Sequence, residues 1–540
     1  MKIGLSKAVQ RAPFVLAALL IALAFFQAWQ ATQGLQWPPT DELLRDTGLA
    51  QAIVDGQGGV DPHIPGEVRW SNPAVPTLIA AVSRLSNLPV PATYAQAGPY
   101  LNLLGPIGLF ILVLMLSEEW TALITLIAYL FLANPQQTAL HQATYSAWPW
   151  SWTVAQGLFF LTTSAMLQTL RSRHWRWAIL SGLLLGLTLL TDTVPMLVLL
   201  VFFSVLSGFF SWHTIDPRER RGLLRLYFLT IACASLLSAY FVWPLLLTYG
   251  FQIRNSVPAE VLTIGPQLVA ENLLGMRSVV FILSLVALWL FPALFGLTWR
   301  RVLELRILLS ILASLFVLSF LLHVLRGLGL ALPQFFPLHS FYLYFRVAET
   351  IIFGAGLLMI ARTILDMVVS DLPAHIAADP RPVLPVLALV GALVYWNAPG
   401  ARASLDMDGY RQLALATQSD TATVALYEWI TQHTREDAVF FAIGEARTAA
   451  VLPSGRKLLV QERIYANPFV APEQREADGR LLLQTITDGD KVGFDRIADA
   501  YQLGYLILPV SDPHCCLPGR EPLSGLSVAF RNSNWVVYQR

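Results

Sequence analysis

Long apolar runs constrain the fold of this chain more than any other feature of its sequence. A helix needs roughly 20 mostly apolar residues to cross a membrane, and about eleven runs approach that length. The runs cover residues 13–31, 97–117, 119–134, 149–170, 177–191, 193–212, 224–248, 278–298, 305–329, 345–365 and 382–398. Only 13% of the residues are charged, which is about half the share in a soluble protein. The sequence therefore predicts a polytopic α-helical membrane protein.

Several other classes of protein fit the sequence poorly. The net charge of +1 argues against a nucleic-acid partner. The three cysteines, Cys233, Cys515 and Cys516, do not make a disulfide framework. The sequence contains no Walker loop, no HExxH, no CxxC and no GxGxxG motif.

Arginine and lysine residues gather on one side of the predicted spans. They precede the first run and follow the fourth, sixth and eighth runs, within residues 2–11, 171–176, 218–225 and 300–306. With eleven spans, the positive-inside rule makes these segments cytoplasmic and everything after residue 399 extracytoplasmic. A cleaved signal peptide is the alternative for the first run, but its apolar core is longer than such peptides carry.

The first outer loop begins with an acidic helix start. Prolines at 38–39 stop the preceding helix, and Thr40 is a good N-cap for a new one. Asp41 and Glu42 then fall in the first turn of an amphipathic helix predicted over residues 41–54. The two acids either complement the helix dipole or carry out chemistry at the membrane surface.

The rest of this loop, which runs to residue 96, holds a second helix signal and three possible metal ligands. Asparagine followed by proline at 72–73 predicts the start of a short helix lying in the membrane surface. Asp61, His63 and Glu67 have side chains that bind metals. The alternative is that they are ordinary polar residues of a turn-rich link.

Three further polar residues lie at outer ends of the predicted spans. His141 and Tyr145 belong to an outer loop rich in hydrogen-bonding and aromatic groups, which suits sugar binding but also resembles an interfacial aromatic belt. Asp192 stands at the outer end of the fifth run. An acid there is either a sugar or acceptor ligand or a helix cap.

Arg346 is predicted at the outer mouth of the tenth span. An arginine in that place is costly unless it is paired. Glu349, three residues later, is on the same helix face and can pair with it. The alternative is a bound phosphate, which the guanidinium fork fits well.

Residues 399–540 have the composition of an ordinary globular domain, and they follow a membrane domain of residues 1–398. Periodicity predicts a helix over 420–433, buried strands over 438–443, 457–461 and 505–509, and a terminal hairpin over 528–538. Alternating strands and helices predict a small extracytoplasmic α/β domain.

The pattern resembles the C-type glycosyltransferase (GT-C) superfamily, and most nearly its bacterial protein mannosyltransferases and lipid A aminoarabinose transferases. Residues 40–42, with the loop continuing to 73, look like the family's first outer loop with its acidic motif and two juxtamembrane helices. Residues 182–195 are similar to a Gly-Leu-x-x-Leu-Thr segment, and 344–346 to an arginine motif. Residues 454–456 and 466–468 look like markers of outer domains in the family. One departure is Asp192, where the family often has lysine or histidine.

The resemblance implies transfer of a sugar from a polyprenyl-phosphate carrier to a glycan, lipid or protein acceptor outside a bacterial cytoplasmic membrane. Asp41 is then the base, Glu42 orients it or shares an optional divalent metal, and Arg346 holds the donor phosphate. Two other functions remain open: a lipid-linked saccharide transporter, and a non-enzymatic membrane scaffold for the outer domain.

Overall fold

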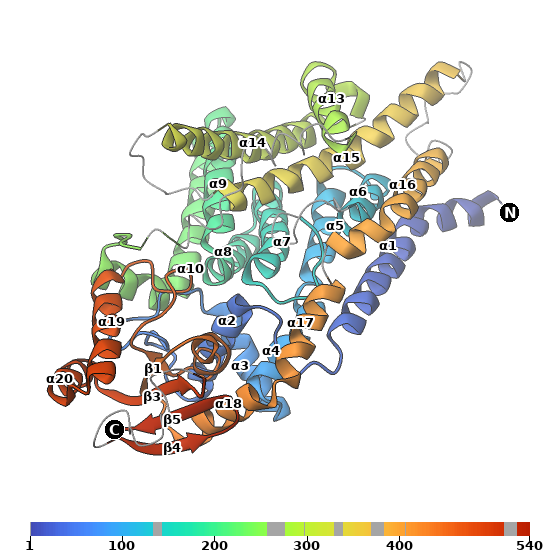
Figure 1. The fold of residues 1–540 in the computed structure, drawn as a ribbon. Helices are drawn as coiled ribbons and strands as arrows, with labels where there is room; N and C mark the ends of the chain where they lie inside the picture. Colours follow the sequence, from blue (N-terminus) through green and yellow to red (C-terminus); the bar gives the residue numbers. More distant parts are fainter. Residues whose placement is uncertain are drawn as a thin grey trace. The chain divides into compact units, whose positions relative to one another are not determined.

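The computed structural model describes residues 2–132, 143–255, 257, 276–295, 297–328, 338–368, 383–404, 407–511 and 526–540. Its contacts divide the chain into two compact units. Unit 1 comprises Met1–Ala31, Pro99–Ala239 and Leu262–Asp408, and unit 2 comprises Thr32–Gly98, Tyr240–Val261 and Gly409–Arg540. Within the described residues, all strands belong to unit 2 (Figure 1).

Unit 1 is built from helices, because its long apolar runs can satisfy their backbone hydrogen bonds internally only in that form. They are α1 (Lys2–Thr32), α5 (Leu104–Leu116), α6 (Glu119–Phe131), α7 (Ser151–Ser172), α8 (Trp175–Thr191), α9 (Thr193–His213), α10 (Pro217–Tyr249, ending in unit 2), α13 (Met276–Leu290), η2 (Pro292–Phe295), α14 (Trp299–Gly327), α15 (Leu338–Val368) and α16 (Val383–Ser404). Each predicted apolar run overlaps one of these helices.

In the part of the chain that is described, six helical stretches are long and apolar enough to cross a membrane. They are Arg11–Thr32, Val90–Leu116, Thr193–His213, Pro217–Tyr249, Trp299–Arg326 and Ser340–Ile364. The prediction of a multi-pass membrane protein is thus confirmed, while the number of eleven spans stays a prediction.

A buried carboxylate joins two of the arginine-rich segments in unit 1. Arg171, in the last turn of α7, and Arg300, near the start of α14, both pair with Glu304, whose side chain is fully buried. The segments 171–176 and 300–306 therefore meet at one end of the helices, as their predicted location on one side of the membrane requires.

Unit 2 combines the first outer loop with the C-terminal part of the chain. Its helices are α2 (Asp41–Val54), α3 (Ala74–Ser86), α4 (Val90–Leu101, ending in unit 1), α17 (Met407–Ser419, beginning in unit 1), α18 (Thr421–His433), the π-helix η4 (Arg447–Val451), α19 (Glu473–Asp488) and α20 (Lys491–Tyr501). Its strands are β1 (Val439–Ala442), β2 (Lys457–Leu458), β3 (Leu503–Pro509), β4 (Ser527–Arg531) and β5 (Trp535–Gln539).

The five strands form one sheet in the order β2-β1-β3-β5-β4. β1 is parallel to β2 and β3, and β5 is antiparallel to β3 and β4. Because successive side chains of a strand point to opposite faces, Phe440 belongs to an apolar cluster with α18 and Leu44 of α2, whereas Phe441 belongs to a second cluster with α19 and α20. The predicted α/β arrangement is present, and α2 is part of its core.

Residues 454–456 attach α2 to this domain. The guanidinium of Arg456 donates to Asp55, just after α2, at 2.6 Å, and the Arg456 side chain is 3% exposed. Gly455 has φ +69°, and a Cβ there would lie 2.7 Å from the Gly48 carbonyl oxygen of α2. Only glycine permits that backbone conformation and that close approach at low cost. The first outer loop, which the sequence analysis grouped with residues 1–398, thus packs on residues 409–540, and independent folding of residues 399–540 stays a prediction.

Candidate functional site

The start of α2 presents the two acids of the first outer loop. Thr40 is extended, with φ −130° and ψ 153°, and its hydroxyl oxygen accepts a hydrogen bond from the Leu43 amide at 3.4 Å. This N-cap makes Asp41 the first helical residue, as the sequence predicts. Leu43 and Leu44 are buried and anchor the turn, while Asp41 is exposed and Glu42 is half-buried.

The charges of two other carboxylates act on Asp41. Partial burial raises the pKa of Asp41 above its ordinary value of 3.8, and the negative charges of Glu462 and Glu445 raise it further. Both glutamates come from the loops that follow β2 and β1. A carboxylate with a raised pKa holds a proton more strongly, which makes it a better general base near neutral pH.

The next charged pair of α2 is already neutralised. Arg45 donates to the buried Asp46 through Nε at 2.9 Å and Nη2 at 2.6 Å. The Arg45 guanidinium also lies over the Trp70 ring, 5.9 Å from its centroid, within the range of a cation–π contact. Arg45 therefore satisfies Asp46 and has no hydrogen bond to Asp41.

Asp61 and His63 are buried and serve the packing of the loop. One oxygen of Asp61 accepts hydrogen bonds from the amides of His63 and Ile64 at 2.9 and 3.2 Å. The Nε2 of His63 lies 3.1 Å from the carbonyl oxygen of Leu452. Burial raises the pKa of Asp61 to about 6 and lowers that of His63 to about 3, so the imidazole is neutral near pH 7.

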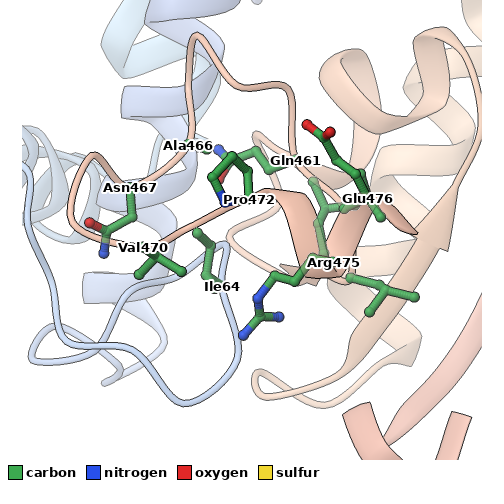
Figure 2. A pocket seen from close by; sticks show the side chains of 11 residues that line it. Ile64, Gln461, Ala466, Asn467, Val470, Pro472, Arg475 and Glu476 are labelled. Atoms are coloured by element: carbon green, nitrogen blue, oxygen red, sulfur yellow. The ribbon is translucent and has the colours of Figure 1, made fainter. Parts of the chain in front are cut away.

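Asn467 links three distant segments of unit 2. Its Nδ2 lies 3.3 Å from Asp61 and 3.2 Å from the Tyr249 hydroxyl, which donates to Glu67 at 2.7 Å. A gap of about 20 Å³ beside it, lined by Ile64 and Asn467 (Figure 2), has room for about one water molecule. The motif at 466–468 thus closes the first outer loop onto the C-terminal domain.

These contacts bear on the predicted metal ligands. Asp61, His63 and Glu67 each use their polar atoms on protein partners. Across the described ranges, no three side chains of His, Cys, Asp or Glu lie close enough together to hold a metal ion. The described residues thus show no set of three metal ligands, and a divalent metal shared by Asp41 and Glu42 stays a prediction.

Arg346 lies inside α15 and forms an ion pair with Glu349 through its Nη1. The side chains of Arg346 and Glu349 are 7% and 0% exposed. The pairing predicted from their spacing is thus present. The phosphate role of Arg346 stays a prediction, and it would use the N–H groups that the pair leaves.

The remaining predicted ligands have separate structural roles or lie outside the described residues. Asp192 is the N-cap of α9 and accepts a hydrogen bond from the Val194 amide at 2.9 Å. The buried Tyr145 donates its hydroxyl to the Pro99 carbonyl oxygen at 2.8 Å. His141 lies outside the described residues. Sugar or acceptor binding by these three residues stays a prediction.

Sequence reasoning missed Glu445 and Glu462, because no local pattern marks them. They follow strands that lie about 400 residues after Asp41 in the chain, and neither belongs to a recognisable motif. A buried strand followed by polar residues was the one available signal, since side chains at the carboxyl ends of parallel strands gather at one edge of a sheet.

No protein-family model matches the sequence, and no curated protein matches it. Solved structures do match. The arabinofuranosyltransferase AftD from Mycobacteria has a TM-score of 0.58 at 15% identity, with 98% of this chain and 40% of that chain covered.

Two other matches have lower scores. The Archaeoglobus fulgidus oligosaccharyltransferase, in complex with Zn and sulfate, has a TM-score of 0.49 at 13% identity and covers 91% of this chain and 68% of that chain. ArnT from Cupriavidus metallidurans, bound to undecaprenyl phosphate, has a TM-score of 0.48 at 12% identity, covering 96% and 97%. These matches are GT-C glycosyltransferases, and the AftD match, with a TM-score above 0.5, shows the fold. This chain has the GT-C fold.

Proposed function

We propose that this protein is a membrane glycosyltransferase that moves a sugar from a polyprenyl-phosphate carrier to an acceptor hydroxyl. The observation that carries the proposal is the exposed Asp41, held at a capped helix start with a raised pKa. The GT-C fold supports the class of reaction. A fold alone does not define a function, so the proposal depends on the site. The arginine-rich segments support a bacterial cytoplasmic membrane location with the N-terminus inside and the C-terminal domain outside.

The proposed step is a single displacement. The acceptor oxygen forms a bond to the anomeric carbon of the donor as the bond from that carbon to the phosphate oxygen breaks. Asp41 takes the proton of the acceptor hydroxyl, and the polyprenyl phosphate leaves with the electron pair. Attack from the face opposite the phosphate inverts the anomeric centre. Phosphate is a good leaving group, so the chemistry needs a base and a cation more than a strong acid.

Glu42 and Arg346 have supporting roles in this proposal. Glu42 is next to Asp41 in the first turn of α2 and orients it. Arg346 holds the leaving phosphate. A guanidinium has five N–H donors, and the ion pair with Glu349 is made through Nη1, so other donors remain for phosphate oxygens.

The test is Asp41→Asn in the full-length protein in nanodiscs, assayed with a panel of radiolabelled polyprenyl-phosphate pentoses and hexoses. Asparagine keeps the shape of the side chain but accepts no proton. We expect turnover to fall by roughly 10²–10⁴, the usual range for a general base, while donor binding stays near that of the parent. Glu42→Gln should cost less.

Glu436→Gln is the matched control, because Glu436 is an exposed glutamate of unit 2 outside the proposed site. It should transfer sugar like the parent. Parent-level transfer per folded molecule in Asp41→Asn would disprove the role of Asp41 as base.

A further inference from the structure

Unit 2 contains a cavity of about 420 Å³ beside the carboxyl ends of β1 and β2. This volume is within the range of about 300–1,000 Å³ typical of small-molecule sites. β1 and β2 are parallel, so the segments that leave them, residues 443–444 and 460–463, emerge at one edge of the sheet. Ligands of open α/β sheets bind at that edge.

The helix α19 forms another wall of the cavity. Gly479 lets this helix approach the sheet, because a Cβ there would lie 2.5 Å from Cγ2 of Val460. Phe441, Ile443 and Leu483 supply apolar surface. Apolar walls with a few charged groups are typical of a binding site.

Two arginines of the cavity are paired, and a third is not. Arg447 pairs with Glu462 at 2.7 Å. Arg463 donates two hydrogen bonds to Glu476, at 2.5 and 2.6 Å. The fifth charged residue of the lining, Arg480, has no hydrogen bond or ion pair with any described residue. The Nε of Arg447 is also buried without a partner among the described residues. Guanidinium donors of Arg480 and Arg447 therefore remain for a ligand.

One residue of the cavity wall, Glu462, acts on the proposed base through its charge. Glu462 is close enough to Asp41 for its charge to raise the pKa of Asp41. Tyr465 continues the same loop. Burial raises the pKa of Tyr465 to about 12, and the negative charges of Asp41, Glu42 and Glu462 contribute to this rise. The loop is braced by Gln461, seen in Figure 2, whose Nε2 donates to the Tyr465 carbonyl oxygen at 3.0 Å.

We propose that this cavity is the acceptor site, and that it selects an acidic saccharide whose carboxylate or phosphate is held by Arg480 and Arg447. An arginine fork matches the two oxygens of such a group. The sugar ring then packs on the apolar wall, with a hydroxyl toward Asp41. The assignment of the bound saccharide as acceptor rests on the proposed function; the binding itself does not.

Binding to the full-length protein in nanodiscs tests the proposal by titration calorimetry. The probes are trigalacturonic acid, its fully methyl-esterified form, and mannose 6-phosphate. We expect trigalacturonic acid or mannose 6-phosphate to bind, and the neutral ester to bind at least about tenfold more weakly, since charge-assisted hydrogen bonds are the strong ones. The preferred acid tells which anionic group the site takes.

Arg480→Gln should weaken binding of the acidic probe by about tenfold or more. Arg496→Gln, at an exposed arginine of α20 outside the cavity, should leave it unchanged. Absence of binding by both acids, equal binding of the acid and its ester, or an unchanged affinity in Arg480→Gln would overturn the proposal.

Asp41→Asn separates this inference from the proposed function. It should bind the acidic probe like the parent while losing transfer. If Asp41→Asn loses transfer but neither the parent nor the variant binds an acidic saccharide, the proposed glycosyltransferase function stands and the proposed acceptor site is overturned. Binding with transfer unchanged in Asp41→Asn would overturn the mechanism and, with it, the acceptor role of the cavity.

Discussion

Asp41, the first residue of α2, and Arg346, inside α15, are the base and the phosphate ligand that the GT-C resemblance predicts, and they lie in opposite surroundings. Asp41 is exposed, and its charged neighbours include Glu445 and Glu462, which carry the same sign. Arg346 is buried and pairs with Glu349 one turn later. Like charges keep a carboxylate basic, whereas an opposite charge occupies some of the donors of a guanidinium before any ligand arrives. Availability for chemistry thus depends on the neighbours of a residue more than on its place in a motif.

The largest expected effect is on stability, and it tests the ion pair of Arg346 with Glu349. Arg346→Ala removes the positive charge that pairs with the buried Glu349, which should cost about 3–5 kcal/mol of stability. The double variant Arg346→Met/Glu349→Gln removes both charges and should recover most of that loss. Unfolding in detergent measures both. If Arg346 also holds the donor phosphate, Arg346→Ala and the double variant bind donor weakly, and Arg346→Lys binds better than Arg346→Ala. Parent-like donor binding in the double variant would reduce Arg346 to a structural role.

A smaller effect tests how α2 positions its acid. Thr40→Ala removes the N-cap hydroxyl and should cost about 1 kcal/mol of stability. Thr40→Ser keeps the acceptor oxygen and should stay close to the parent. Because the cap sets the first turn, turnover per folded molecule should fall in Thr40→Ala and be restored in Thr40→Ser. Equal turnover in both variants would show that the cap does not position Asp41.

The smallest effect is a shift in pH dependence. The rate of transfer should rise with pH as Asp41 loses its proton. Because the pKa of Asp41 is raised, this rising limb of the pH–rate profile should lie above pH 3.8. Glu462→Gln removes a negative charge that opposes ionisation, so it should move the limb to lower pH. Glu473→Gln is the control, because Glu473 contacts Arg463 at 3.6 Å and is not among the groups that raise the Asp41 pKa. A limb that is the same in both variants would show that Glu462 does not act on the base.

Local chemistry explains which parts of the fold were predictable. The start of α2 at Asp41 follows from Thr40, and α18 begins at Thr421 because Asp420 caps it. The terminal hairpin forms around Asn532, whose side-chain oxygen accepts hydrogen bonds from the backbone amides of residues 534 and 535. α3 differs slightly: it begins at Ala74 with Pro73 as N-cap and no side-chain cap bond, since the asparagine before it lies outside the helix.

The sequence by itself determined the membrane class, the helices of the apolar runs and the acidic turn that begins at Asp41, because hydropathy, periodicity and capping act over a few residues. Only the tertiary structure decided what surrounds that turn. Arg456 holds the end of α2 from 401 positions away, and the loops after β1 and β2 bring Glu445 and Glu462 near Asp41. Such neighbours arise from packing between distant segments, which no local pattern encodes.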